Sequence, residues 1–152
     1  MLASIILALA SGPSVQRLDE LRSDLRPFLD AIATVESRNN DHAVGDNGRA
    51  IGRYQIWQVY WQDAYVYAPT IKGTYQDVKS QEYAERVMVA YFLRYAKSAV
   101  IEHDYEKLAR IHNGGPNGHK KRATLPYWNR VRASYICPFC GDCCLTIWRT
   151  GV

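Results

Sequence analysis

The chain has 152 residues and a formal net charge of +4, and this length fits one domain of ordinary size. Hydrophobic residues make up 47% and charged residues 22%, a balance that excludes an intrinsically disordered chain. No apolar run reaches the roughly 18 residues that a membrane-spanning helix needs, and the basic run at His119–Arg122 is too short to indicate nucleic-acid binding. We therefore predict one globular domain without a membrane span.

The first residues, MLASIILALASG, have the apolar character of a secretory signal peptide. Ala8-Leu9-Ala10 fits the small-residue pattern of a cleavage site, although the positively charged start of such peptides is missing. An ordinary apolar N-terminus is the alternative. We predict that residues 1–12 direct export, so that the protein is secreted or periplasmic, and that the domain spans residues 13–136.

Two helical segments are predicted before the first polar loop. Leucines at helical spacing within residues 18–25 indicate one or two amphipathic turns. Pro27 suits the first turn of a helix, because its missing N–H needs no partner there. Phe28, Ile32 and Val35 then form an apolar stripe, which predicts that this helix ends near Glu36.

Residues 38–53 are rich in Asn, Asp and Gly, which favour turns. We predict a loop or a short hairpin there, with Asp46-Asn47-Gly48 as a tight turn. The next helix is expected to begin near Tyr54 and to end at Pro69 and Gly73.

Three more helices are predicted in the second half of the chain. One runs from Ser80 to Ala96, with apolar residues around much of its circumference, as in a helix at the centre of a domain. The next covers residues 105–112 and ends at the breaker Asn113-Gly114-Gly115-Pro116. The last follows Pro126. The expected fold is mainly α, with about five helices and a small β-hairpin after the helix that carries Glu36.

The cysteines all lie near the C-terminus, at Cys137, Cys140, Cys143 and Cys144. Their spacing is compatible with zinc binding or local disulfides, but four thiols so close together leave little room for a tetrahedral metal site. We predict a disulfide-bonded or reactive tail over residues 137–152, outside the domain, and no bound metal.

Glu36 is the first candidate for acid–base chemistry. A glycosidase needs one carboxylic acid to protonate the leaving oxygen and a second carboxylate to oppose positive charge or to activate water. A partly buried carboxyl at the negative end of a helix dipole keeps its proton more readily, and the predicted helix end would give Glu36 that position. Asp46 is the candidate second carboxylate and Asp41 its rival, although both also suit an ordinary turn-forming role.

Three separated segments resemble the invertebrate-type lysozymes, also called destabilase-like, within the lysozyme superfamily. They are VES at Val35–Ser37, GRYQIWQVYWQDA from Gly52 to Ala64 and ARIHNGGPNGHKKRATLPYWNRV from Ala109 to Val131. The resemblance implies a lysozyme-like α+β fold. It also implies a muramidase that hydrolyses the β-1,4 bond between N-acetylmuramic acid and N-acetylglucosamine without a cofactor. It gives the acid role to Glu36 and places the second carboxylate in the loop before Gly52, where Asp46 is nearest.

The same resemblance implies a set of substrate-binding residues. The tyrosine and glutamine of this set would line the cleft floor, the histidine and asparagine would face the same cleft, and the glycines would let main-chain amides bind a sugar N-acetyl group. The set is Tyr54, Gln55, His112, Asn113, Gly114 and Gly115. The implied partner is the glycan of peptidoglycan, or chitin oligomers, bound by a monomer.

Two alternative functions are compatible with these motifs. A lytic transglycosylase would act on the same bond through Glu36 alone and would close an anhydro ring without water. A non-catalytic protein that binds cell-wall glycan would be expected to have lost the acid, and Glu36 is present.

Overall fold

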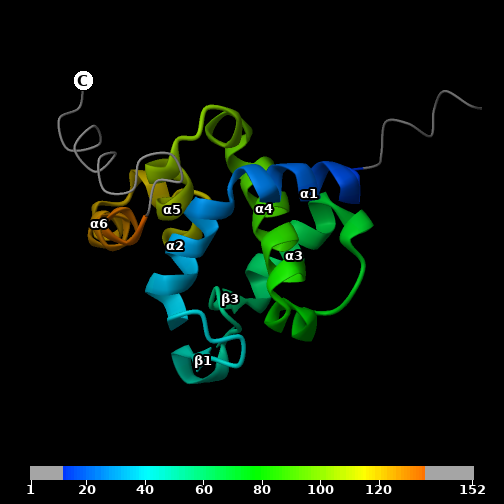
Figure 1. The fold of residues 1–152 in the computed structure, drawn as a ribbon, viewed down its shortest axis with the longest axis horizontal. Helices are drawn as coiled ribbons and strands as arrows, with labels where there is room; N and C mark the ends of the chain where they lie inside the picture. The colour runs from blue at the N-terminus through cyan, green and yellow to red at the C-terminus, as the bar shows by residue number, and fades with distance from the viewer. Residues whose placement is uncertain (1–11, 136–152) are drawn as a thin grey trace, which may run out of the picture.

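The computed structural model describes residues 12–135, so residues 1–11 of the predicted signal segment and the cysteine-rich tail lie outside the described residues. Between residues 12 and 135 the chain forms six α-helices, a three-stranded antiparallel sheet and five short 3₁₀ turns (Figure 1). The expectation of a mainly α fold with a small β segment is confirmed. The helices are α1 (Val15–Asp24), α2 (Arg26–Ser37), α3 (Gln58–Tyr67), α4 (Gln81–Ile101), α5 (Tyr105–Gly114) and α6 (Leu125–Ser134).

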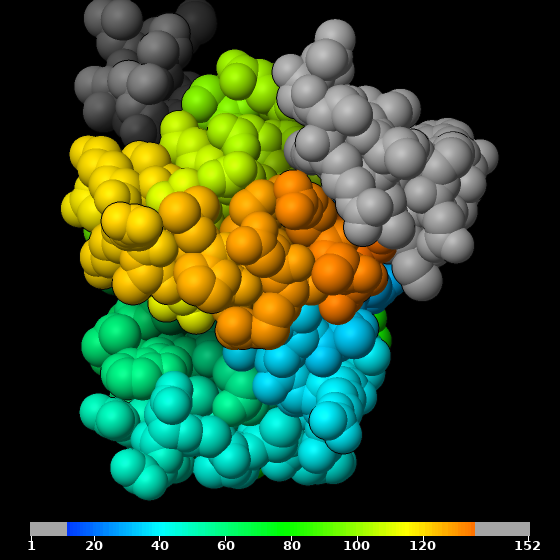
Figure 2. Space-filling view, turned by 90° about the vertical axis from the view of Figure 1, so that its left-hand side faces the viewer, coloured from blue at the N-terminus to red at the C-terminus, as the bar shows by residue number. Residues whose placement is uncertain are grey.

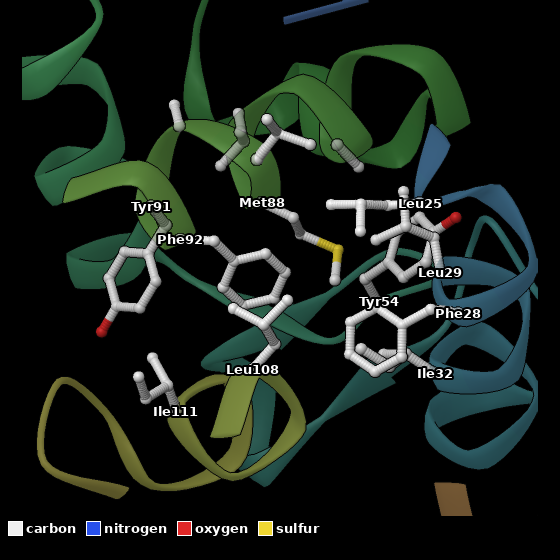
Figure 3. Packing of buried hydrophobic residues seen from close by; sticks show 14 of the residues in the cluster. Leu25, Phe28, Leu29, Ile32, Tyr54, Met88, Tyr91, Phe92, Leu108 and Ile111 are labelled. Carbon is white, nitrogen blue, oxygen red and sulfur yellow. The ribbon is translucent and has the colours of Figure 1, made fainter. Parts of the chain in front are cut away.

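The helix α4 lies at the centre of the fold, and α1, α3 and α5 all pack against it. Its residues are buried on nearly every side, as its apolar circumference predicted. Figure 3 shows Met88 and Phe92 of this helix between side chains of α2 and α5. At Ala96, where the sequence predicted the end of the helix, φ is −153° and ψ is 48°. The helical path is interrupted there and resumes to Ile101.

The first two helices follow each other almost without a break. The Ser14 side chain accepts a hydrogen bond from the Arg17 amide at 3.2 Å and caps α1, which is a full helix of 10 residues rather than the expected one or two turns. Pro27 lies in the first turn of α2, as predicted. Arg38, with φ of 56°, takes the left-handed conformation that ends α2 directly after Ser37. Glu36 is therefore in the last turn of α2.

The small sheet consists of β1 (Val44–Gly45), β2 (Ala50–Ile51) and β3 (Ile56–Trp57), paired in that order. The predicted tight turn at residues 46–48 joins β1 to β2, and all three of its residues have positive φ. The start expected for the next helix, near Tyr54, is wrong. Ile56 and Trp57 pair with β2 instead, and α3 begins only at Gln58.

A buried carboxylate holds this part of the fold together. Glu85 of α4 is fully buried, and its oxygens accept hydrogen bonds from Arg22 at 3.1 Å, from Arg26 at 2.5 Å and from the Tyr54 hydroxyl at 2.6 Å. The two arginines come from α1 and α2. A buried charge needs such partners to offset its lost hydration. Glu85 thus connects three helices to the loop between β2 and β3.

Candidate active site

A cleft of about 380 Å³ lies between the sheet and α3 on one side and the end of α5 on the other. Figure 2 shows an indentation between the cyan and green residues of the sheet and α3 below and the yellow and orange residues that follow α5 above. The cleft is lined by Glu36, Asp46, Gln55, Trp57, Val59, Tyr60, Asp63, Tyr91, His112, Asn113, Gly115 and Pro116.

Glu36 lies in the wall of this cleft with its side chain 18% exposed. Its Oε1 accepts a hydrogen bond from the Tyr127 hydroxyl at 2.7 Å, and the Nε2 atom of His112 is 3.5 Å from the same oxygen. Between residues 12 and 135 no group hydrogen-bonds Oε2, yet this atom is not buried. Oε1 is therefore the protein-bound oxygen, and Oε2 is the one free to meet a substrate.

The tyrosines beside Glu36 are held in their neutral form. Burial raises the pKa of Tyr127 well above its usual range, and the nearby Glu36 carboxylate raises it further. Burial also raises the pKa of Tyr60, with smaller effects from Tyr91 and Glu36. Both hydroxyls therefore keep their protons at neutral pH, and Tyr127 acts as a hydrogen-bond donor to Glu36.

His112 lies behind Glu36, with its side chain only 4% exposed. Its Nδ1 is 3.4 Å from the Tyr60 hydroxyl, and its ring stands edge-on to Tyr60 and Phe92. Its distances to Glu36 and Tyr60 are long for hydrogen bonds. This packing favours a supporting role for His112 in the cleft wall. Its place near the end of α5 agrees with the helix that the sequence predicts over residues 105–112.

Asp46 lies in the same cleft, at the turn between β1 and β2, and is exposed. Its Oδ2 accepts a hydrogen bond from the indole Nε1 of Trp57 at 3.0 Å. The Arg49 guanidinium covers the Trp57 ring at 4.8 Å from the centroid, and its Nε donates to the Asp46 carbonyl at 3.1 Å. Trp57 and Arg49 therefore fix the position of this carboxylate.

Asp41, the rival second carboxylate, does not line the cleft. It forms an ion pair with Arg53, whose Nε lies 2.7 Å from Oδ1. The structure therefore brings Glu36 and Asp46 together in one cleft and places Asp41 elsewhere, with its own charged partner.

Of the six residues expected to bind substrate, Gln55, His112, Asn113 and Gly115 line the cleft. Contrary to expectation, Tyr54 does not. Its side chain is fully buried among α2 residues, as Figure 3 shows, and its hydroxyl donates to Glu85. The hydroxyl is the one polar group of this side chain, and its hydrogen bond to Glu85 lets the apolar ring be fully buried.

Gly114 also lies outside the cleft lining. A Cβ at this position would lie 2.6 Å from the Thr124 methyl group, so close packing explains the glycine here. Its carbonyl accepts a hydrogen bond from the Lys121 ammonium at 2.6 Å. Gly115, by contrast, has φ of 78° and open space around the position of a Cβ.

Sequence reasoning missed several residues of the cleft, among them Trp57, Val59, Asp63 and Tyr91. Val59 and Asp63 share one face of α3 at a spacing of four residues, a pattern that could have pointed to them. Asp63 accepts a hydrogen bond from the Tyr95 hydroxyl at 2.9 Å, and Arg94 lies 3.8 Å from its other oxygen.

Within the described residues, no group of three His, Cys, Asp or Glu side chains is arranged to hold a metal ion. The cleft instead offers three carboxyl groups, those of Glu36, Asp46 and Asp63, and the first two lie in different surroundings. Glu36 is largely enclosed by aromatic side chains, and Asp46 is exposed and anchored by an indole N–H. Two carboxyl groups with unlike environments are the minimum that acid-catalysed glycoside hydrolysis needs.

The family model described as Destabilase matches residues 26–134. A lysozyme of Meretrix lusoria is 34% identical over 107 residues, which are 68% of this chain and 84% of that protein. A lysozyme of Magallana gigas is 36% identical over 80 residues, 53% of this chain and 56% of that protein.

Solved structures show the same similarity. The crystal structure of Tapes japonica lysozyme has a TM-score of 0.60 and 27% sequence identity, over 76% of this chain and 91% of that one. Meretrix lusoria lysozyme, solved in complex with PliI of Aeromonas hydrophila, has a TM-score of 0.59 and 31% identity, over 71% of this chain and 88% of that one.

Proposed function

Since this chain belongs to the Destabilase family, we propose that it is a muramidase, a lysozyme that hydrolyses the β-1,4 bond between N-acetylmuramic acid and N-acetylglucosamine in peptidoglycan. The observation that carries the proposal is the pairing of Glu36 and Asp46 in one cleft. Glu36 is the general acid and Asp46 is the second carboxylate.

The proposed reaction follows from the different surroundings of the two carboxyl groups. Glu36 donates its proton from Oε2 to the glycosidic oxygen as the bond from the sugar C1 to that oxygen breaks. The exposed Asp46 carboxylate opposes the positive charge that develops on the sugar ring. Water supplies the hydroxyl that ends on C1, and its remaining proton restores Glu36. The products are two glycan fragments, one with a new reducing end.

The other residues of the cleft support glycan binding. Gln55 and Asn113 offer side-chain amides, and the Gly115 backbone is open to close approach. Trp57 is 38% exposed at the cleft and provides an apolar face beside polar partners. Amide groups and aromatic faces suit the N-acetyl groups and rings of amino sugars.

The test of the acid is Glu36→Gln, measured as clearing of a bacterial cell-wall suspension. General acid catalysis contributes roughly 100- to 10,000-fold, so we expect a loss of that order in a folded protein. Asp41→Asn is the matched control, because it removes a carboxylate of the same loop region outside the cleft, and it should retain most of the activity. Clearing by the Glu36→Gln variant at the wild-type rate would refute the assignment.

The role of Asp46 separates hydrolysis from transglycosylation. Asp46→Asn keeps a side chain that can still contact Trp57 but removes the charge. A hydrolase that needs both carboxyl groups should lose at least roughly 100-fold in rate, whereas a single-acid transglycosylase should tolerate the change. The presence of Asp46 in the cleft supports the first outcome.

Export of the protein remains part of the proposal, because the substrate lies outside the cytoplasm. Of the helices between residues 12 and 135, none has the length and apolarity to cross a bilayer. The apolar residues 1–12 are the proposed export signal.

A further inference from the structure

Tyr127 contacts Glu36 but is not among the residues that line the cleft, and the proposed reaction gives it no role. It lies in α6, 91 residues after Glu36, and the residue is 3% exposed. Its hydroxyl is 2.7 Å from Glu36 Oε1, which is the shortest contact that this carboxyl makes among the described residues. The motif around Tyr127 matched the family resemblance, but no role was evident for it from the sequence.

The direction of this hydrogen bond is fixed by the chemistry of its partners. Because burial and the Glu36 charge keep the Tyr127 hydroxyl protonated, it has one proton to give and Glu36 Oε1 receives it. A tyrosine hydroxyl can also accept a hydrogen bond, but if the acid proton of Glu36 lay on Oε1 and pointed at Tyr127, the proton of the buried Tyr127 hydroxyl would have no acceptor within residues 12–135. In the acid form of Glu36, the proton must then be on Oε2, which has no protein partner within residues 12–135 and is not buried.

We propose that Tyr127 is a positioning residue that fixes the transferable proton of Glu36 on the cleft-facing Oε2. This inference rests on the proposed function and adds to it the group that selects which oxygen is the acid. After proton transfer, the same hydroxyl stabilises the carboxylate that forms, because hydrogen bonds to a charged acceptor are stronger than those to a neutral one. Tyr127 itself touches no substrate atom.

Other groups near Glu36 do not replace this contact. His112 Nε2 is 3.5 Å from Oε1, beyond a strong hydrogen bond. The titratable and charged groups that face Glu36 or Tyr127 come from α3, α4, α5, α6 and the β1–β2 turn, and they are Tyr60, Asp63, Tyr91, His112, Arg130 and Asp46. Arg130 interacts with the Tyr127 ring, with its guanidinium 5.5 Å from the ring centroid.

The test is Tyr127→Phe, which removes one hydroxyl and keeps the ring. With the proton no longer confined to Oε2, kcat on a soluble glycan substrate should fall roughly 10- to 100-fold, with little change in KM. Because the lost bond favoured the ionised carboxyl, the alkaline limb of the kcat profile should move to higher pH, by about one pH unit. The pH at which this limb lies does not depend on the fraction of protein that is folded, so a structural role alone would not move it.

Tyr54→Phe is the matched control. It also removes a buried hydroxyl that donates to a carboxylate, Glu85, but outside the cleft. Both variants should lower the thermal midpoint by similar amounts. Only Tyr127→Phe should move the alkaline limb, and this difference separates positioning from a merely structural role.

Two results would overturn the inference. One is an alkaline limb at the wild-type pH in the Tyr127→Phe variant, and the other is an equal shift in the Tyr54→Phe variant. Failure of the proposed function is distinct, because wild-type protein would then release no glycan fragments at any pH.

Discussion

Glu36 obtains its chemical surroundings from residues that are distant in the sequence. Tyr127 donates to it from α6, and His112 lies behind it from α5. The next residue, Ser37, donates its hydroxyl to the Arg53 carbonyl at 2.8 Å and so ties the end of α2 to the loop that carries Gln55. The position of the acid relative to the cleft floor is fixed by these contacts rather than by the helix alone.

Gly45 controls the position of Gln55 in the cleft. A Cβ at residue 45 would lie 2.2 Å from Gln55 Oε1, and Gln55 is already held at φ of 49° with its Nε2 donating to the Gly52 carbonyl at 2.9 Å. Gly45→Ala should displace this amide. We expect KM to rise roughly three- to tenfold, the effect of one lost hydrogen bond, with little change in kcat.

A double-mutant cycle checks this prediction. In a Gln55→Ala background the clash is gone, so Gly45→Ala should add little to KM. An equal rise of KM in both backgrounds would show that Gly45 acts through the β1–β2 pairing instead.

The central helix α4 is held in place by a buried charge as well as by apolar packing. Glu85→Ala would leave Arg22, Arg26 and the Tyr54 hydroxyl without their common acceptor. Removal of one partner from a buried network is strongly destabilising, so we expect the free energy of unfolding to fall by about 3 kcal/mol, measured by urea denaturation.

The control for Glu85 is on the same helix. Glu82 is paired with Arg86 but 56% exposed, and Glu82→Ala should cost less than about 1 kcal/mol. Equal losses for the two variants would mean that the burial of Glu85 is unimportant for stability.

The sequence predicts well the helices whose first or last residues are marked by a local signal, such as a proline or a glycine. Pro27 marks the start of α2, the Asn113–Pro116 run ends α5, and Pro126 starts α6. Strand β3 has no such local mark. Ile56 and Trp57 continue the apolar spacing of α3, and only pairing with β2, together with the positive φ of Gln55, separates them from that helix.

The cleft brings together segments of the chain from residue 36 to residue 116. Motifs identified Glu36, Asp46, Gln55, His112, Asn113 and Gly115, because these residues lie in or beside recognisable turns and helix ends. Asp63 and Tyr91 were not predicted as cleft residues, because each lies in the middle of a helix, where only tertiary packing decides which face meets the cleft. Tyr54 was misplaced for the same reason, since its buried partner Glu85 is 31 residues away.

If Glu36 and Asp46 together hydrolyse the glycan strand, the products of peptidoglycan digestion will show it. Purified peptidoglycan is digested with the wild-type protein and the soluble fragments are examined by mass spectrometry. We predict fragments that end in reducing N-acetylmuramic acid, each heavier by one water than an anhydro product, and none with Glu36→Gln. Fragments with 1,6-anhydro ends would contradict hydrolysis, and equal release by the Glu36→Gln variant would contradict the role of Glu36.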